Sequence, residues 1–374
     1  MKQLNISQVD TIFANGSYTI EFMLYYKNKI NTQKIKSALK KLSTDFWPIF
    51  GQYESGTIHF DKYVESDCFE EDIINEDFNS DLSYRDFYEK YNKAVPENLK
   101  KLFFLKVIQY KNGTILIPKM KHLAGDGYSY FYFLSVLAQI SQSRSIPLKG
   151  WLIKLLARPN HNRIVLKEFK LPNIELTKFK VAKNVTINDE FISKSDVRKM
   201  IREIADNADQ KVSTNDILSA MVVKKLIEVQ KDNIGDEYVL NIPIDVRRNV
   251  KDYGQKFFGN GLMFNQIHFK TEHILKSEIG EIAIQIRQGM PEISTQSYKD
   301  YLQSLENIIS KKQTDLLKPY DPETGCLVTN LSRLPANRLN FGSGNPDLIF
   351  PLTVGKNAAS VLADDKNFIL RLVY

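Results

Sequence analysis

A short motif in the first half of the chain combines residue types that proton-transfer chemistry requires. It reads His122-Leu-Ala-Gly-Asp126-Gly127. A neutral imidazole titrates at roughly pH 6.5, so His122 can take a proton from an attacking hydroxyl or amine and return it to a leaving group. The motif therefore predicts general-base catalysis by His122. A structural histidine, in the core or on the surface, is the alternative.

The other residues of the motif allow more than one interpretation. Asp126 fits either an acid that orients the imidazole or a carboxylate that turns away and pairs with an arginine to brace the loop, and we favour bracing. Gly125 and Gly127 predict positive φ or the close approach of a ligand, because glycine tolerates both. Simple turn glycines are the alternative.

The elements around His122 predict a rigid support for it. Apolar runs at 102–108 and 113–117 predict two strands joined by a tight turn, and the second leads directly to His122. Residues 128–142 then follow a helical period. A histidine between a strand and a helix is well placed to face a cleft. A further strand is predicted at 17–27.

The length of 374 residues predicts two domains. We expect a first lobe at 1–148, a crossover linker at 149–183 and a second lobe at 184–374. The acidic stretch 65–81 is interpreted as a solvated loop. Other expected elements are helices at 35–42, 192–204, 213–230 and 278–288, and strands at 238–244 and 261–269. Both halves therefore mix strands and helices, as an α/β fold does.

Composition excludes several classes of function. Hydrophobic residues make up 43% of the chain and charged residues 25%, as in ordinary globular proteins. The net charge of +7 is scattered, which argues against nucleic-acid binding. Two cysteines, no signal peptide and no membrane span predict a cytoplasmic protein, and we expect a monomer. The histidines lack metal-site spacing, so we predict no metal.

Several further segments accompany the histidine motif in a fixed order from residue 6 to residue 346. In chain order, these segments include Ile6-Ser-Gln-Val-Asp10, Trp47-Pro48-Ile-Phe-Gly51, Val212-Ser213-Thr214, Asp245-Val-Arg247, Phe258-Gly-Asn260, Thr329-Asn-Leu-Ser and Asn340-Phe-Gly-Ser-Gly344. Together they resemble the BAHD acyltransferases, relatives of chloramphenicol acetyltransferase and of peptide-synthetase condensation domains.

The resemblance implies two chloramphenicol-acetyltransferase-like lobes, each a mixed sheet flanked by helices, with a channel at their interface. It implies an acyl-CoA-dependent O- or N-acyltransferase for acyl groups other than aminoacyl. Acyl-CoA would be a co-substrate, a small molecule the acceptor, and no cofactor would stay bound. A thiolate with a pKa of roughly 8 to 9 leaves readily, so direct attack needs no covalent enzyme intermediate.

The resemblance also implies roles for individual residues. Arg247 would pair with Asp126, Thr329 would donate to the tetrahedral oxyanion, and Lys211 and Ser213 would contact CoA. Three positions depart from the family pattern. Leu331 replaces a tryptophan beside the acceptor pocket, which leaves the substrate class open, while Asn340 and Ser343 replace an aspartate and a tryptophan in a structural loop, which predicts altered packing with activity retained.

Two other functions remain open on the sequence. A condensation-like enzyme would take its acyl group from a carrier protein, but such enzymes usually carry a second histidine where this chain has Lys121. A catalytically silent binding or scaffolding protein could keep the same fold, although the intact His122, Asp126, Gly127 and Arg247 argue against it. Hydrolysis through Cys68 or Cys326 has no supporting motif.

Overall fold

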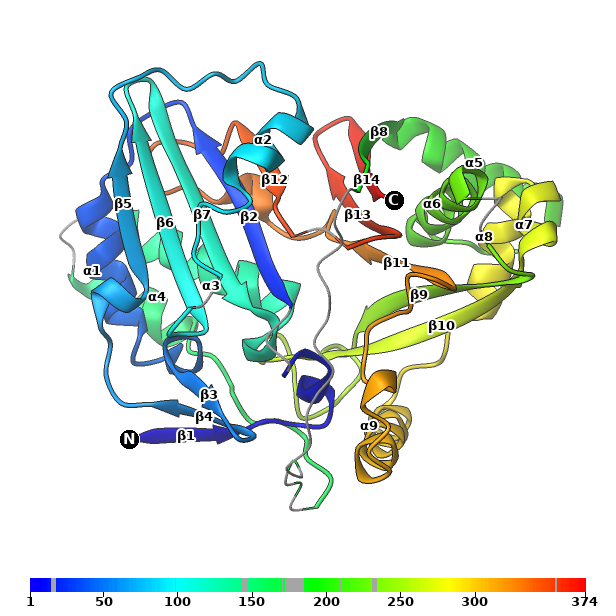
Figure 1. The fold of residues 1–374 in the computed structure, drawn as a ribbon, viewed down its shortest axis with the longest axis horizontal. Helices are drawn as coiled ribbons and strands as arrows, with labels where there is room; N and C mark the ends of the chain where they lie inside the picture. Colours follow the sequence, from blue (N-terminus) through cyan, green and yellow to red (C-terminus); the bar gives the residue numbers. More distant parts are fainter. Residues whose placement is uncertain are drawn as a thin grey trace.

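In a computed structural model, the chain forms two large mixed sheets and one small sheet, with helices packed around them (Figure 1). The predicted α/β fold with mixed sheets is confirmed. The structure describes residues 1–14, 18–97, 99–142, 147–167, 169, 171, 185–208, 210–230, 234–353 and 355–374.

The sheet of the first lobe is covered on both faces. Its strand order is β12 (Leu348–Pro351), β2 (Thr19–Tyr26), β7 (Gly113–Lys121), β6 (Phe103–Tyr110) and β5 (Phe69–Ile73). Successive β2 residues, such as Leu24 and Tyr25, belong to different apolar clusters on the two faces of the sheet. One cluster includes α1 (Thr32–Leu42) and α3 (Gly127–Gln142), and the other includes α2 (Tyr84–Tyr91). Burial on both faces explains the continuous apolar run in β2.

The second sheet belongs mainly to the C-terminal half. Its order is β10 (Leu262–Lys270), β9 (Glu237–Asp245), β11 (Gly325–Asn330), β13 (Ala358–Ala363), β14 (Asn367–Val373) and β8 (Ile187–Ser193). Strand β11 is parallel to both neighbours, and the other pairs are antiparallel. The helices of this half are α5 (Lys194–Ala208), α6 (Thr214–Gln230), α7 (Thr271–Lys276), α8 (Ile279–Gln288) and α9 (Thr295–Ser310).

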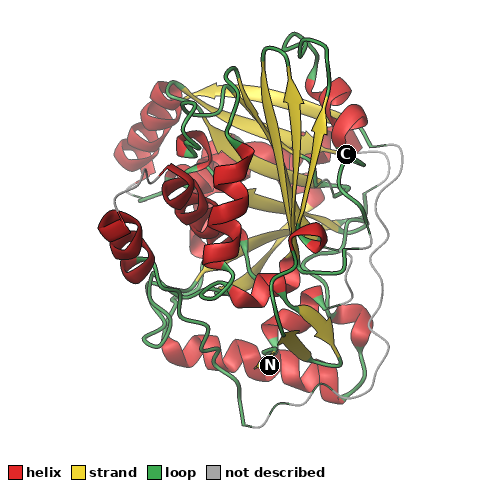
Figure 2. Cartoon of the chain, turned by 90° about the vertical axis from the view of Figure 1, so that its left-hand side faces the viewer, coloured by secondary structure: helices red, strands yellow, loops and turns green. Residues whose placement is uncertain are grey.

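A small sheet lies beside the N-terminus. Strand β4 (Thr57–Phe60) pairs with β1 (Lys2–Asn5) and β3 (Gln52–Glu54). Figure 2 shows it beside the N mark, in the lower part of the view. Single 3₁₀ turns connect the elements at Val9–Phe13 (η1), Trp47–Phe50 (η2), Glu65–Asp67 (η3), His122–Ala124 (η4), Thr314–Leu316 (η5) and Ala336–Arg338 (η6).

The structure corrects the loop predicted at 65–81. This acidic stretch contains β5, which pairs in parallel with β6 at the edge of the first sheet. Lys106 of β6 places its Nζ 3.0 Å from a Glu70 oxygen and 2.7 Å from an Asp72 oxygen. The carboxylates on the strand are therefore balanced by the neighbouring strand, which a local charge pattern does not reveal.

The predicted crossover linker at 149–183 also contains regular structure. Helix α4 (Pro147–Leu156) lies there and packs on α3. Residue 168, residue 170 and residues 172–183 of that segment, including Pro172, lie outside the described residues. The helix predicted at 192–204 is also corrected at its start, because Ile192 belongs to strand β8.

The second half of the chain extends into the first lobe at the interface between the lobes. Strand β12, from residues 348–351, pairs antiparallel with β2 in the first sheet. The guanidinium of Arg371 on β14 lies 4.3 Å from the ring centroid of Tyr84 on α2. The lobe boundaries stay a prediction, but β12 shows that the second half of the chain contributes a strand to the first sheet.

Candidate active site

His122 lies where strand β7 ends and the turn η4 begins, directly before helix α3. Its backbone N–H donates to the Tyr18 carbonyl at 3.0 Å. The Phe13 ring of η1 stacks on the imidazole with centroids 3.9 Å apart and planes 16° apart. The half-buried ring is therefore held by neighbours on two other segments.

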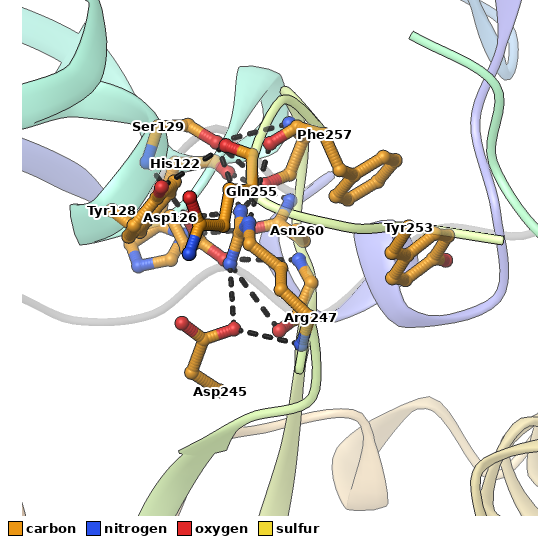
Figure 3. A network of polar contacts seen from close by, with 12 residues as sticks. His122, Asp126, Tyr128, Ser129, Asp245, Arg247, Tyr253, Gln255, Phe257 and Asn260 are labelled. Atoms are coloured by element: carbon orange, nitrogen blue, oxygen red, sulfur yellow. Dashed lines mark hydrogen bonds and ion pairs between the residues drawn. The ribbon is translucent and has the colours of Figure 1, made fainter. Parts of the chain in front are cut away.

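The imidazole Nδ1 lies 3.1 Å from the side-chain oxygen of Asn260 (Figure 3). The Asn260 Nδ2 donates to an Asp10 carboxylate oxygen at 2.7 Å and to the His122 carbonyl at 3.0 Å. Those oxygens can only accept, so the amide nitrogen must face them and the amide oxygen must face the ring. His122 Nδ1 therefore carries a proton and donates it to Asn260, which leaves the Nε2 lone pair free.

Asp10 anchors Asn260 from a fully buried position. Its second oxygen accepts the backbone N–H and the hydroxyl of Ser7, both at 2.8 Å. The same oxygen lies 2.7 Å from Nε of Arg163, whose side chain is 2% exposed. A chain of contacts thus runs from Arg163 through Asp10 and Asn260 to His122, and it joins four distant segments of the sequence.

Asp126 directs its carboxylate away from the imidazole. One oxygen accepts the Ser129 N–H at 3.0 Å and contacts Nη2 of Arg247 at 2.8 Å. The other accepts the Gly261 N–H at 2.9 Å. These contacts fit a carboxylate that braces the loop better than one that orients the histidine.

Arg247 joins the two lobes at this point. It follows strand β9, and its guanidinium also donates to the Gly259 carbonyl and the Ser129 hydroxyl, both at 3.0 Å, and to Asp245 at 3.1 Å (Figure 3). The Tyr128 ring centroid is 4.6 Å from the guanidinium carbon. The start of α3 in the first lobe is therefore tied to the strand ends of the second.

Charge and burial set the protonation states of the central pair. Burial lowers the pKa of His122 below its usual value, although the nearby Asp126 carboxylate acts in the opposite direction. Burial alone would raise the pKa of Asp126, but the Arg247 ion pair and two backbone N–H groups outweigh it, so that pKa is lowered. At neutral pH the imidazole is neutral and the carboxylate charged, the state in which His122 accepts a proton.

Packing explains one of the two motif glycines. Positive φ was one expectation, but Gly125 is extended with φ of 170° and Gly127 is the first residue of α3. A Cβ at Gly125 would lie 2.8 Å from the Ser129 Cβ, so the close approach of Ser129 requires glycine there. A Cβ at Gly127 would lie 3.5 Å from Leu331, which is an ordinary contact distance, so packing does not require glycine at this position.

Thr329 lies on β11, on the side of the strand that faces the first lobe. Val328 belongs to the apolar core of the second lobe, and side chains alternate along a strand. Leu331, two residues after Thr329, packs against the core of the first lobe and approaches Gly127. The end of β11 therefore approaches the histidine motif, with the half-buried Thr329 on the same side as Leu331.

The predicted CoA contacts lie at the start of helix α6. Ser213 caps this helix, since its N–H donates to Asp216 at 2.7 Å and its hydroxyl accepts the Asp216 N–H at 3.4 Å. Lys211 is exposed. Asn215 accepts a hydrogen bond from Asn330, the last residue of β11, at 2.9 Å. The start of α6 is thus next to the strand that carries Thr329.

The loop with Asn340 and Ser343 lies against the first lobe. The Asn340 side chain accepts the Gly342 N–H at 2.7 Å, and the Ser343 carbonyl accepts from Asn28 at 3.2 Å. Phe341 meets the Tyr26 ring edge-on. These contacts are local packing, and the altered packing with retained activity expected from the two departures stays a prediction.

Asp10, Asn260, Phe13, Ser129 and Arg163 form the site together with His122 but were not predicted as site residues. Asp10 and Asn260 stand in segments that carried the family resemblance, so a signal for them existed. Their contact spans 250 residues of sequence and follows from the fold alone. In the described residues, no group of three or more His, Cys, Asp or Glu side chains could hold a metal ion.

The family model of the Transferase family matches residues 1–369, so the chain belongs to this family, that of the BAHD acyltransferases. No curated protein matches the sequence. None of the helices in the described part of the chain is long and apolar enough to cross a membrane.

Solved structures share the fold over the whole chain. The F. graminearum TRI101 complex with coenzyme A and T-2 mycotoxin is 15% identical with a TM-score of 0.77, covering 100% of this chain and 95% of that one. Vinorine synthase is 18% identical with a TM-score of 0.75, covering 100% and 90%. The first condensation domain of the CDA synthetase is 9% identical with a TM-score of 0.60, covering 100% and 90%.

Proposed function

We propose that this protein is an acyl-CoA-dependent acyltransferase that transfers an acyl group other than aminoacyl to a small hydroxyl or amine acceptor. One observation supports this most directly. Asn260 holds His122 Nδ1 in its protonated form, so Nε2 is the available base. Membership of the BAHD acyltransferase family supplies the class of reaction. TRI101, which shares the fold, was crystallised with coenzyme A.

The reaction proceeds by direct attack. His122 Nε2 takes the proton as the acceptor oxygen or nitrogen bonds to the thioester carbonyl carbon. The tetrahedral intermediate carries a negative oxygen until it collapses, when the C–S bond breaks and His122 returns the proton to the CoA sulfur. The products are an ester or amide and free CoA. The lowered pKa of His122 keeps it unprotonated before attack.

Other residues of the site have supporting roles in this proposal. Thr329 donates to the tetrahedral oxyanion; its place on the side of β11 that faces the first lobe, the same side as Leu331, supports this role. Asp126 and Arg247 hold the loop of the motif through their ion pair. Lys211 binds a CoA phosphate beside the N–H groups at the start of α6, where anions are stabilised, whereas Ser213 acts as the helix cap.

We further propose that the enzyme works as a monomer in the cytoplasm. Both cysteines, Cys68 and Cys326, are buried and free. Burial raises the pKa of each thiol to about 12. Thiols of this kind are unreactive and compatible with a reducing compartment.

Calorimetric titration with CoA and acetyl-CoA tests the proposed donor without knowledge of the acceptor. Micromolar binding of one molecule per chain is expected. Lys211→Glu should weaken it about tenfold, since one phosphate contact becomes a repulsion. Lys199→Glu, at an exposed lysine on α5, is the matched control. If CoA does not bind, the donor is a carrier protein or the fold is a silent scaffold.

A further inference from the structure

Helix α4 presents a group of large apolar side chains to solvent. Residues 147–158 include Lys149, Lys154 and Arg158 but no acidic residue. The exposed fractions along the helix are 59% for Trp151, 46% for Leu152, 49% for Leu155 and 61% for Leu156. These four residues are called the α4 patch. Adjacent exposed apolar side chains of this size commonly mark a binding surface.

The opposite side of α4 fixes the helix to the first lobe. Ile153 and Ala157 pack against the core, and the Tyr132 hydroxyl donates to the Ala157 carbonyl at 2.8 Å. Lys154 donates to the Thr44 hydroxyl at 2.9 Å and lies 3.3 Å from an Asp45 oxygen. The helix is therefore docked by its inner side, and the α4 patch faces outward in the folded protein.

Basic residues stand next to the α4 patch. At about 100° per residue, the four apolar side chains cover an arc of about 140°, and Lys149 follows this arc by about 20° on one side. Arg158 lies two residues after the end of the helix, which is Leu156. Lys149 and Arg158 are exposed. Tryptophan and leucine beside cations are typical of helices that lie in the plane of a membrane interface.

Further cations lie close to the helix. Lys2 donates to the Thr44 carbonyl at 2.8 Å, and Lys154 contacts the same residue. Lys40 and Lys41 are exposed at the end of α1, directly before that residue. Helices α1 and α4 lie at the same end of the molecule (Figure 1). The surroundings of the α4 patch are therefore positively charged, with Asp45 already paired to Lys154.

We propose that the α4 patch binds an anionic lipid surface, with the helix parallel to the membrane plane and its four apolar side chains in the interface. Ten residues are too few to span a bilayer, which takes about 20. A second copy of this chain docked by two-fold symmetry would bring like charges of Lys149 and Arg158 together. Four side chains are also few against the roughly 20 to 30 residues per partner of a stable protein interface.

Sedimentation of the full chain with phospholipid vesicles tests this proposal. We expect binding to vesicles of phosphatidylcholine that contain phosphatidylglycerol, weaker binding to phosphatidylcholine alone, and loss of binding at high salt. Leu152→Ser with Leu155→Ser should lower the partition coefficient at least about tenfold, because two of the apolar side chains that enter the membrane interface become polar. Lys149→Glu with Arg158→Glu should have a similar effect.

The matched control is Leu275→Ser with Leu316→Ser, which alters two leucines of similar exposure, 39% and 55%, elsewhere on the surface. This variant should bind vesicles like the unchanged protein. In a Trp47→Phe background, Trp151 is the sole tryptophan, and its emission should shift to the blue on vesicle binding. Equal sedimentation of the unchanged protein and the α4 leucine variant would overturn the proposal, as would a dimer that only the α4 leucine variant disrupts. Neither outcome bears on CoA binding.

Discussion

Replacement of Asn260 by alanine should lower kcat, while substrates can still reach His122. Asn260 receives the Nδ1 proton of His122 at 3.1 Å and donates to Asp10 at 2.7 Å and to the His122 carbonyl at 3.0 Å. Without the amide, Nδ1 loses its acceptor, and the imidazole proton can move to Nε2, where it blocks the base. The loss of one such hydrogen bond, about 0.5–1.5 kcal/mol, corresponds to a decrease in kcat of about two- to thirteenfold.

The same substitution should also lower stability. Asp10 is fully buried and would lose a hydrogen bond to one of its charged oxygens. A buried charged acceptor without its donor costs about 1.5–3 kcal/mol, so the free energy of unfolding should fall by about that amount. Urea unfolding at pH 7 measures it.

Asn265→Ala is the matched control for both measurements, because Asn265 lies on β10 and its side chain donates to the Gly289 carbonyl and contacts the Met290 sulfur, both in the second half of the chain. The diagnostic assay is nitrogen NMR of labelled histidine, in which His122 should have a protonated Nδ1 in the unchanged protein and a mixture of tautomers in Asn260→Ala. An unchanged tautomer together with an unchanged kcat would refute the reasoning.

Three further results are expected. Arg247→Ala should lower the free energy of unfolding by about 3–5 kcal/mol, because it leaves the buried Asp126 carboxylate unpaired; a change below about 1 kcal/mol in denaturant unfolding would contradict this ion pair's importance. Since the pKa of His122 is lowered, kcat/KM should rise with pH along a limb whose midpoint lies below roughly pH 6.5 and then stay level; a midpoint above that pH would contradict the burial argument. Leu331→Trp should narrow the space beside Gly127 and reduce turnover of bulky acceptors more than small ones, measured as a ratio of kcat/KM values; an unchanged ratio would place the acceptor elsewhere.

Strong local patterns predicted much of the fold. The hairpin of β6 and β7 and the helix after the motif follow from long apolar periods. By contrast, β12 is a four-residue strand whose partner, β2, lies more than 300 residues away, so no local pattern identifies it. Strand β5 was missed because its carboxylates suggested a solvated loop, whereas Lys106 balances two of them.

The candidate site was predictable only where a motif contained the chemistry. His122 and Asp126 stand in one hexapeptide, and Arg247 entered through the family resemblance. The contacts of Asp10 with Asn260 and Arg163 join segments from both lobes and from the crossover, which only the folded chain brings together. Positive φ for Gly125 was a wrong expectation, since a tight contact with Ser129 requires glycine there for space.

The most direct test of the account is acyl transfer by His122→Ala. Release of free CoA from acetyl-CoA is followed with an acceptor found by screening the unchanged protein, and His268→Ala, at an exposed histidine on β10, is the control. We predict that His122→Ala keeps its fold and its CoA affinity but loses about 10²- to 10⁴-fold in kcat, the usual contribution of a general base. A His122→Ala enzyme that transfers the acyl group at the rate of the control would contradict the proposed mechanism.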